Sequence, residues 1–173
     1  MADVITSGLA PAAVLWQVCL QTEPCWLPEG WKLGYGVFVL AAFSALRLAK
    51  FNIDETQTVE FCGLPTPAGS LLCASLGMLW QQGMLALSSD GVLLVAVLTS
   101  LLLVSPIRMF ALKFHGFGWR GNEVRYLFLL ASIVLIIILR TYAIPVIIVL
   151  YIVVSAVRWL CMRSGNPDKA PKA

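Results

Sequence analysis

Charged residues divide the chain into six apolar segments, which we interpret as membrane-spanning helices. Several are shorter than the ~20 residues that a straight span needs, but Lys and Arg at their ends can snorkel to the interface. The pattern predicts an all-α polytopic membrane bundle with six transmembrane helices. The segments lie between Asp3 and Glu23, Lys32 and Arg47, Glu60 and Asp90, Asp90 and Arg108, Arg125 and Arg140, and Arg140 and Arg158.

The run VIIVLYIVV in the last segment is rich in β-branched residues, which favour strands in water. An open strand cannot satisfy its backbone polar groups in lipid. We therefore predict a helix for this run as well.

Composition supports a chain that lies mostly in lipid. Of its 173 residues, 60% are hydrophobic and only 12% are charged, with a mean hydropathy of +0.87. A soluble domain carries about twice that share of charged residues. We expect one membrane-embedded domain over residues 1–162, a polar cytoplasmic tail over residues 163–173, and no nucleic-acid partner.

The distribution of Lys and Arg predicts the orientation in the membrane. With Asp3 in the cytoplasm and six crossings, the outer loops hold only Lys32 and Arg140 out of twelve cations. The positive-inside rule favours this arrangement, with both termini cytoplasmic. The other ten are Arg47, Lys50, Arg108, Lys113, Arg120, Arg125, Arg158, Arg163, Lys169 and Lys172.

The cysteines and the one histidine do not predict a zinc site, because no CxxC pair is present. Cys19 and Cys25 flank one predicted loop, so they could form a disulfide or serve as apolar filler thiols. His115 stands in a glycine-rich loop and receives no role.

Asp3 is the first residue that could carry chemistry. It stands in the first turn of the first apolar segment, where the helix dipole favours an acid. An ionisable group at the end of a membrane helix is also a functional candidate. The residue pattern alone leaves both interpretations open.

Basic residues at the cytoplasmic ends of two apolar segments form the second candidate. Arg47 and Lys50 share a helix face at i, i+3 spacing, and Arg108 and Lys113 follow a later segment. They could act only as topology signals, or together they could hold a phosphate. The nearby stretch GLPTPAG predicts a rigid, extended entry into a helix.

Three stretches resemble the bacterial CDP-diacylglycerol–serine O-phosphatidyltransferases, or phosphatidylserine synthases, of the CDP-alcohol phosphotransferase family. They are ADVITSGLAPA, FSALRLAKFN and FCGLPTPAG, and VSPIRMFALKF is similar to a later cytoplasmic segment of the family. The resemblance covers nearly all of residues 1–125. It implies about eight transmembrane helices in an intact member and a homodimer.

The family signature is D-G-x2-A-R-x8-G-x3-D-x3-D, and Asp3 aligns with its last Asp. The residues of the signature before Met1 are absent, so we expect Met1 to be an internal methionine taken as a start. The resemblance implies that the first three Asp of the signature bind a divalent metal, Mg or Mn. None of these ligands is retained here, so we expect no bound metal and no activity from this chain as written.

The resemblance also implies a reaction and roles for four residues. The family transfers a phosphatidyl group from CDP-diacylglycerol to L-serine, giving phosphatidylserine and CMP in phospholipid biosynthesis. Asp3 matches the proposed general base, which takes the proton of the serine hydroxyl. Arg47, Lys50 and Arg108 are candidate anion contacts. The alternative is a small non-enzymatic membrane protein or transporter, which the position of the ionisable residues at helix ends disfavours.

Overall fold

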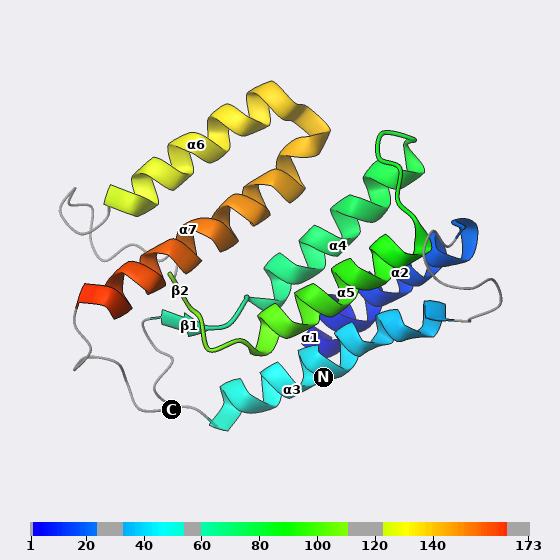
Figure 1. The fold of residues 1–173 in the computed structure, drawn as a ribbon, viewed down its shortest axis with the longest axis horizontal. Helices are drawn as coiled ribbons and strands as arrows, with labels where there is room; N and C mark the ends of the chain where they lie inside the picture. Colours follow the sequence, from blue (N-terminus) through cyan, green and yellow to red (C-terminus); the bar gives the residue numbers. More distant parts are fainter. Residues whose placement is uncertain (1, 24–32, 54–59, 111–122, 166–173) are drawn as a thin grey trace.

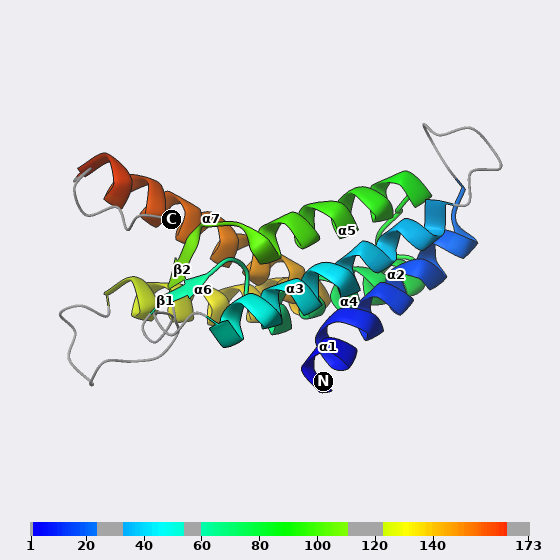
Figure 2. The same ribbon diagram turned by 90° about the horizontal axis from the view of Figure 1, so that it is seen from below.

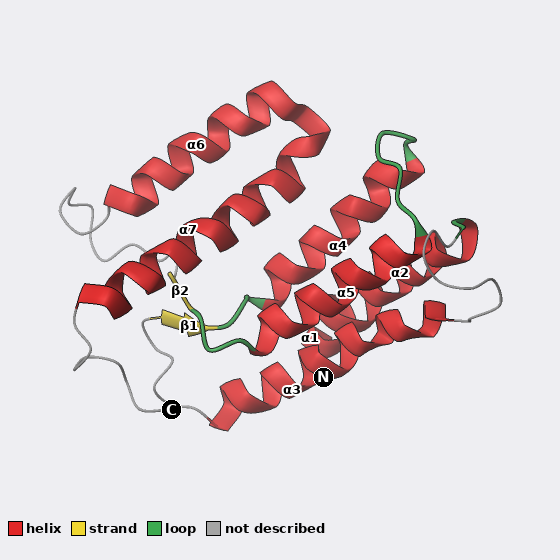
Figure 3. Cartoon of the chain, viewed as in Figure 1, coloured by secondary structure: helices red, strands yellow, loops and turns green. Residues whose placement is uncertain are grey.

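The computed structural model describes residues 2–23, 33–53, 60–110 and 123–165, and it is almost entirely helical (Figures 1 and 3). The first helix runs without a break through three parts, and a short 3-10 turn leads into each of α3 and α7. The helical elements are α1 (Ala2–Val4), η1 (Ile5–Leu9), α2 (Ala10–Gln21), η2 (Leu33–Phe38), α3 (Val39–Ile53), α4 (Thr66–Gln81), α5 (Ser89–Val104), α6 (Glu123–Leu139), η3 (Arg140–Tyr142) and α7 (Ala143–Gly165).

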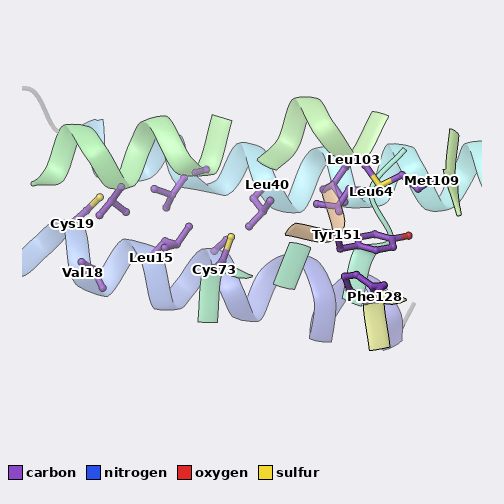
Figure 4. Packing of buried hydrophobic residues seen from close by; sticks show 14 residues of the cluster. Leu15, Val18, Cys19, Leu40, Leu64, Cys73, Leu103, Met109, Phe128 and Tyr151 are labelled. Atoms are coloured by element: carbon purple, nitrogen blue, oxygen red, sulfur yellow. The ribbon is translucent and has the colours of Figure 1, made fainter. Parts of the chain in front are cut away.

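Helices α2, α3, α4 and α5 pack into a bundle around a common apolar core. The hairpin of α6 and α7 joins this bundle through α7, which lies against α4 (Figure 1). The close view in Figure 4 shows side chains from several helices meeting in one continuous cluster. Its labelled members are Leu15, Val18, Cys19, Leu40, Leu64, Cys73, Leu103, Met109, Phe128 and Tyr151.

Small residues let the first helix approach its neighbours closely, as is usual where helices pack in lipid. A Cβ atom added at Gly8 would lie 2.9 Å from Ser44 Cβ on α3. One added at Gly77 on α4 would lie only 2.4 Å from Val14 Cγ1 on α2. These two glycines therefore set how near η1 comes to α3 and how near α2 comes to α4.

The structure contains a short two-stranded sheet that the prediction of an all-α fold did not include. Strand β1 (Glu60–Cys62) pairs antiparallel with β2 (Arg108–Phe110), and Cys62 lies opposite Arg108. The sheet joins the two long loops that the charge pattern places in the cytoplasm, and β2 packs against α7 (Figure 2). Three-residue strands show too little alternation to be recognised in a sequence.

The GLPTPAG stretch forms the rigid helix entry that its prolines predict. Gly63 has a φ of +79° and donates its backbone N–H to Ile107 O at 2.9 Å. Pro65 is extended, with φ −56° and ψ 132°, and α4 begins at the next residue with Pro67 in its first turn. The prediction of a helix for VIIVLYIVV is confirmed too, because the run lies inside α7.

Among the described residues, three helical stretches are long and apolar enough to cross a membrane: Ala2–Gln21, Gly34–Asn52 and Val124–Cys161. The third contains two of the six predicted segments, joined at η3. Ser89–Val104 is a shorter apolar helix. The expected bundle is thus helical and apolar in its described part, whereas six separate transmembrane helices stay a prediction.

Candidate active site at the start of the first helix

Asp3 lies in the first turn of α1 with its side chain exposed. Its Oδ1 atom accepts a hydrogen bond from Ser7 Oγ at 3.2 Å, and its Oδ2 atom accepts one from Thr66 Oγ1 at 3.5 Å. The π-helical turn η1 follows directly, and such turns often occur at functional sites. The carboxylate is thus oriented by hydroxyl groups and stays open to a ligand.

Thr66 connects Asp3 to Arg47. The Thr66 side chain is only 3% exposed, at the start of α4, and its hydroxyl oxygen accepts a hydrogen bond from Arg47 Nη1 at 3.4 Å. One hydroxyl can donate to the carboxylate and accept from the guanidinium at the same time. Both distances are at the long end of the hydrogen-bond range, so the link is loose. Three elements far apart in sequence therefore meet at one point.

Helix α7 supplies the wall behind Arg47. The Arg47 guanidinium interacts electrostatically with the Asp3 carboxylate, and the side chains of Tyr151 and Cys62 lie nearby. Tyr151 is buried, and its ring packs against Phe128 in an edge-to-face contact with 5.9 Å between the ring centroids. The site therefore combines a carboxylate, a cation and hydroxyl groups at one end of the bundle.

The other two predicted anion contacts lie at the same end but not in this cluster. Lys50 is exposed in the last turn of α3, three residues after Arg47. Arg108 is exposed on β2, opposite Cys62, which interacts with Arg47. The structure thus brings Asp3 and Arg47 together and leaves Lys50 and Arg108 at the rim.

Thr66 and Tyr151 are the site residues that sequence reasoning missed. Thr66 stands in the GLPTPAG stretch, which we interpreted only as a rigid helix entry. The one feature of the sequence that could have indicated a role for Thr66 is its hydroxyl group between two prolines at the start of a predicted membrane helix. Tyr151 gave no signal, since it stands inside an apolar run.

The residues at this site do not fit a divalent metal. Within the described ranges, no group of three or more His, Cys, Asp or Glu side chains comes together. Asp3 is the one carboxylate of the cluster just described, and Mg or Mn requires several oxygen ligands.

Several residues raised by the sequence lie outside the described ranges. These are Cys25, Lys32, Lys113, His115, Arg120, Lys169 and Lys172. Cys19 is a buried free thiol. This favours the apolar filler thiol over the Cys19–Cys25 disulfide.

No protein-family model matches the chain. The chain is 29% identical over 118 residues to the CDP-diacylglycerol–serine O-phosphatidyltransferase of Bacillus subtilis strain 168, and 36% identical over 118 residues to that of Mycobacterium leprae strain TN. The chain is a distant homologue of these phosphatidyltransferases. The resemblance inferred from its motifs is thereby confirmed.

The alignments cover only part of each relative. The two alignments cover 66% and 63% of this chain, but only 58% and 37% of the respective relatives. The chain thus spans little more than half of one phosphatidyltransferase and about a third of the other.

Proposed function

We propose that the chain serves in a membrane phosphatidyltransferase that moves the phosphatidyl group of CDP-diacylglycerol to L-serine, forming phosphatidylserine and CMP. The observation that carries the proposal is the Asp3–Thr66–Arg47 link, which places a carboxylate and a cation side by side. Homology to two phosphatidyltransferases acting on serine supports the choice of reaction.

Each member of the link has a role in this proposal. Asp3 accepts the proton of the serine hydroxyl, and the oxygen attacks the phosphatidyl phosphorus while CMP leaves. Ser7 and Thr66 hold the carboxylate in orientation through their hydrogen bonds to its two oxygens. Arg47 offers positive charge to an anionic group of a substrate, and Lys50 and Arg108 add positive charge at the rim.

The arrangement of the loops supports a cytoplasmic site in a multi-pass protein of the bacterial inner membrane. The sheet of β1 and β2 joins the two predicted inner loops beside the site. At the opposite end, Tyr142 donates to Met84 O at 2.8 Å, and Ser89 N–H donates to Glu23 O at 3.3 Å, linking predicted outer connections. The predicted inner loops thus lie at one end of the bundle and the predicted outer connections at the other. Six crossings with both termini in the cytoplasm require this separation. A homodimer remains part of the proposal on the resemblance alone.

Asp3→Asn tests the role of the carboxylate. Membranes from source cells carrying this change at the native locus should lose CDP-diacylglycerol-dependent incorporation of labelled serine into chloroform-soluble lipid by about 100-fold or more, as expected for a lost general base. Glu23→Gln is the matched control, since Glu23 is exposed at the other end of the first helix. Unchanged incorporation with Asp3→Asn would overturn the assignment, and serine uptake into sealed vesicles without lipid labelling would indicate a transporter.

Residues 1–173 on their own should not catalyse the transfer of the phosphatidyl group to serine. A single carboxylate in the described cluster cannot hold the metal that the family's chemistry uses. The purified chain, given CDP-diacylglycerol, serine and Mn in detergent, should release no CMP above the background of a serine-free sample. Serine-dependent release would contradict this proposal and leave the assigned reaction intact.

A further inference from the structure

Helix α6 lies at the outside of the molecule, and α7 stands between it and the bundle (Figure 1). Its contacts with the other described elements are chiefly with α7 and the turn η3. Its exposed large apolar side chains are Val124, Leu127, Leu129, Leu130, Ile133, Val134, Ile136, Ile137 and Ile138. In a membrane, the acyl chains of lipids cover such a surface. Lipid is therefore the neighbour to which most of the surface of α6 is suited.

Two arginines mark the predicted cytoplasmic end of the α6–α7 hairpin. Arg125 on α6 precedes the turn η3, residues 140–142, by 15 residues, and Arg158 on α7 follows it by 16. At about 1.5 Å per residue, both lie roughly 22–24 Å along their helices from the turn. A half-buried aromatic residue, Tyr126 or Trp159, follows each arginine, and such residues are typical of the headgroup level of a membrane. The two cations thus lie at a similar depth, where lipid phosphates are found.

The contact between Phe128 and Tyr151 shows which faces of α6 and α7 meet, with 5.9 Å between the ring centroids. Arg125 precedes Phe128 by three residues and Arg158 follows Tyr151 by seven, so each arginine lies on the side of its helix that makes this contact. Both are half-buried and interact with other groups of the chain. A guanidinium group has five N–H donors, so each can bind a phosphate as well. Glu123 is the one acid in the sequence of these two helices, which leaves their cytoplasmic end positively charged.

An exposed apolar stripe continues from Arg125 along α6. Leu129, Ile133 and Ile136 follow it at i+4, i+8 and i+11, and they are 45%, 49% and 55% exposed. Residues at these spacings lie along one face of a helix. The hydrocarbon of one leaflet is about 15 Å thick, which corresponds to about ten residues of helix. The stripe is thus about as long as the acyl region of one leaflet, with a cation at its polar end.

We propose that the cytoplasmic end of the α6–α7 hairpin is a binding surface for anionic phospholipids of the inner leaflet. Arg125 and Arg158 contact the headgroup phosphates, because guanidinium groups bind phosphate oxygens through charge-assisted hydrogen bonds. The apolar stripe that follows Arg125 packs against an acyl chain. A zwitterionic headgroup adds a cation of its own, which the arginines repel, so the surface favours lipids with a net negative charge. This surface is separate from the Asp3–Thr66–Arg47 link and does not depend on the proposed reaction.

Native mass spectrometry of the purified 1–173 chain in detergent tests this surface, with phosphatidylglycerol and phosphatidylcholine of identical acyl chains as probes. The chain should bind phosphatidylglycerol at least about tenfold more tightly than phosphatidylcholine. Arg125→Gln and Arg158→Gln should each reduce this preference about fivefold, as expected for one charge lost beside an anionic lipid. The double variant should bind both lipids about equally. Arg140→Gln is the matched control and should keep the preference, because Arg140 is exposed at the other end of the same hairpin.

The remaining outcomes each count against the proposal. Equal binding of the two lipids by the unchanged chain overturns it, as does a full preference in a folded double variant. A preference that Lys50→Gln abolishes and the double variant retains places the lipid at the candidate active site instead. Displacement of phosphatidylglycerol by an equal concentration of inorganic phosphate indicates a simple anion site without an acyl-chain contribution.

A salt titration of the unchanged chain keeps the proposal testable if the glutamine variants do not fold. The preference for phosphatidylglycerol should fall as the ammonium acetate concentration rises, because ions screen exposed charges. A preference that does not change with salt contradicts a role for the arginines. None of these measurements uses catalysis, so the labelled-lipid assay on native membranes judges the proposed function separately.

Discussion

At the scale of single residues, the site depends on one hydroxyl group. Thr66 is buried between an exposed carboxylate and a half-buried guanidinium, and it touches both. A direct Asp3–Arg47 ion pair would neutralise the carboxylate and occupy it. The intervening hydroxyl instead orients the two charged groups and leaves each a side on which to bind a substrate.

Thr66→Val is a sharp test of this arrangement, because valine has nearly the same shape without the hydroxyl. Loss of a hydrogen bond to a charged group costs about 1.5–3 kcal/mol, so serine incorporation in native membranes should fall at least ~10-fold. Thr66→Ser should retain most of the activity. If Thr66→Val and Thr66→Ser behave alike, the hydroxyl is not what connects Asp3 to Arg47.

Asp3 and Arg47 could be nominated from the sequence, because a charge at the end of an apolar segment is visible in the pattern. Thr66 and Tyr151 could not, since their roles arise from contacts between helices far apart in the chain. Tyr151 lies within an apolar run whose pattern reports only burial in lipid or protein. Its neighbours depend on how α7 packs against the bundle.

At the scale of elements, the helices were predictable. In lipid, a helix is the only structure in which a single segment can form all of its own backbone hydrogen bonds. The strands Glu60–Cys62 and Arg108–Phe110 were not, because their pairing depends on two loops meeting in space. The crossings of helices rest on glycines whose importance the sequence alone does not reveal. Gly77 is the clearest case.

Gly77→Ala should destabilise the bundle by about 1–3 kcal/mol, since its new methyl group would overlap Val14 Cγ1. The expected result is a lower Tm of the detergent-solubilised protein in scanning fluorimetry. Val14→Ala removes the clashing methyl group, so the double variant should recover most of the loss. Gly34→Ala is the control, because a Cβ there meets its nearest side-chain atom, on Trp16, at an ordinary 3.6 Å. A Gly77→Ala variant as stable as the control would show that α2 and α4 can move apart freely.

At the scale of the whole molecule, the two ends of the bundle differ in character. One end holds Asp3, Arg47 and the sheet, and the other holds the connections around Glu23, Met84 and Tyr142. Large apolar side chains are exposed along α6, as expected for a surface that faces lipid. The candidate site therefore lies at the end that the charge pattern assigns to the cytoplasm.

This orientation can be tested with single cysteines in a variant without the native ones. Gln82→Cys and Asn52→Cys are a matched pair, because both positions are exposed at helix ends and belong to opposite ends of the bundle. In intact cells, a membrane-impermeant thiol reagent should label position 82 and spare position 52. Disrupted cells should show labelling of both. The reverse pattern in intact cells would invert the orientation and place Asp3 outside.

The attachment of the α6–α7 hairpin has a consequence for how the protein is made. Helix α7 is the last described helix to leave the ribosome, yet it carries Tyr151, which lies beside Arg47 on a helix synthesised about a hundred residues earlier. Until the hairpin inserts and docks, Arg47 lacks its neighbour Tyr151. The candidate site is therefore completed only after α7 has been made, and a chain that stops before α7 can be inserted in the membrane and still lack part of this site.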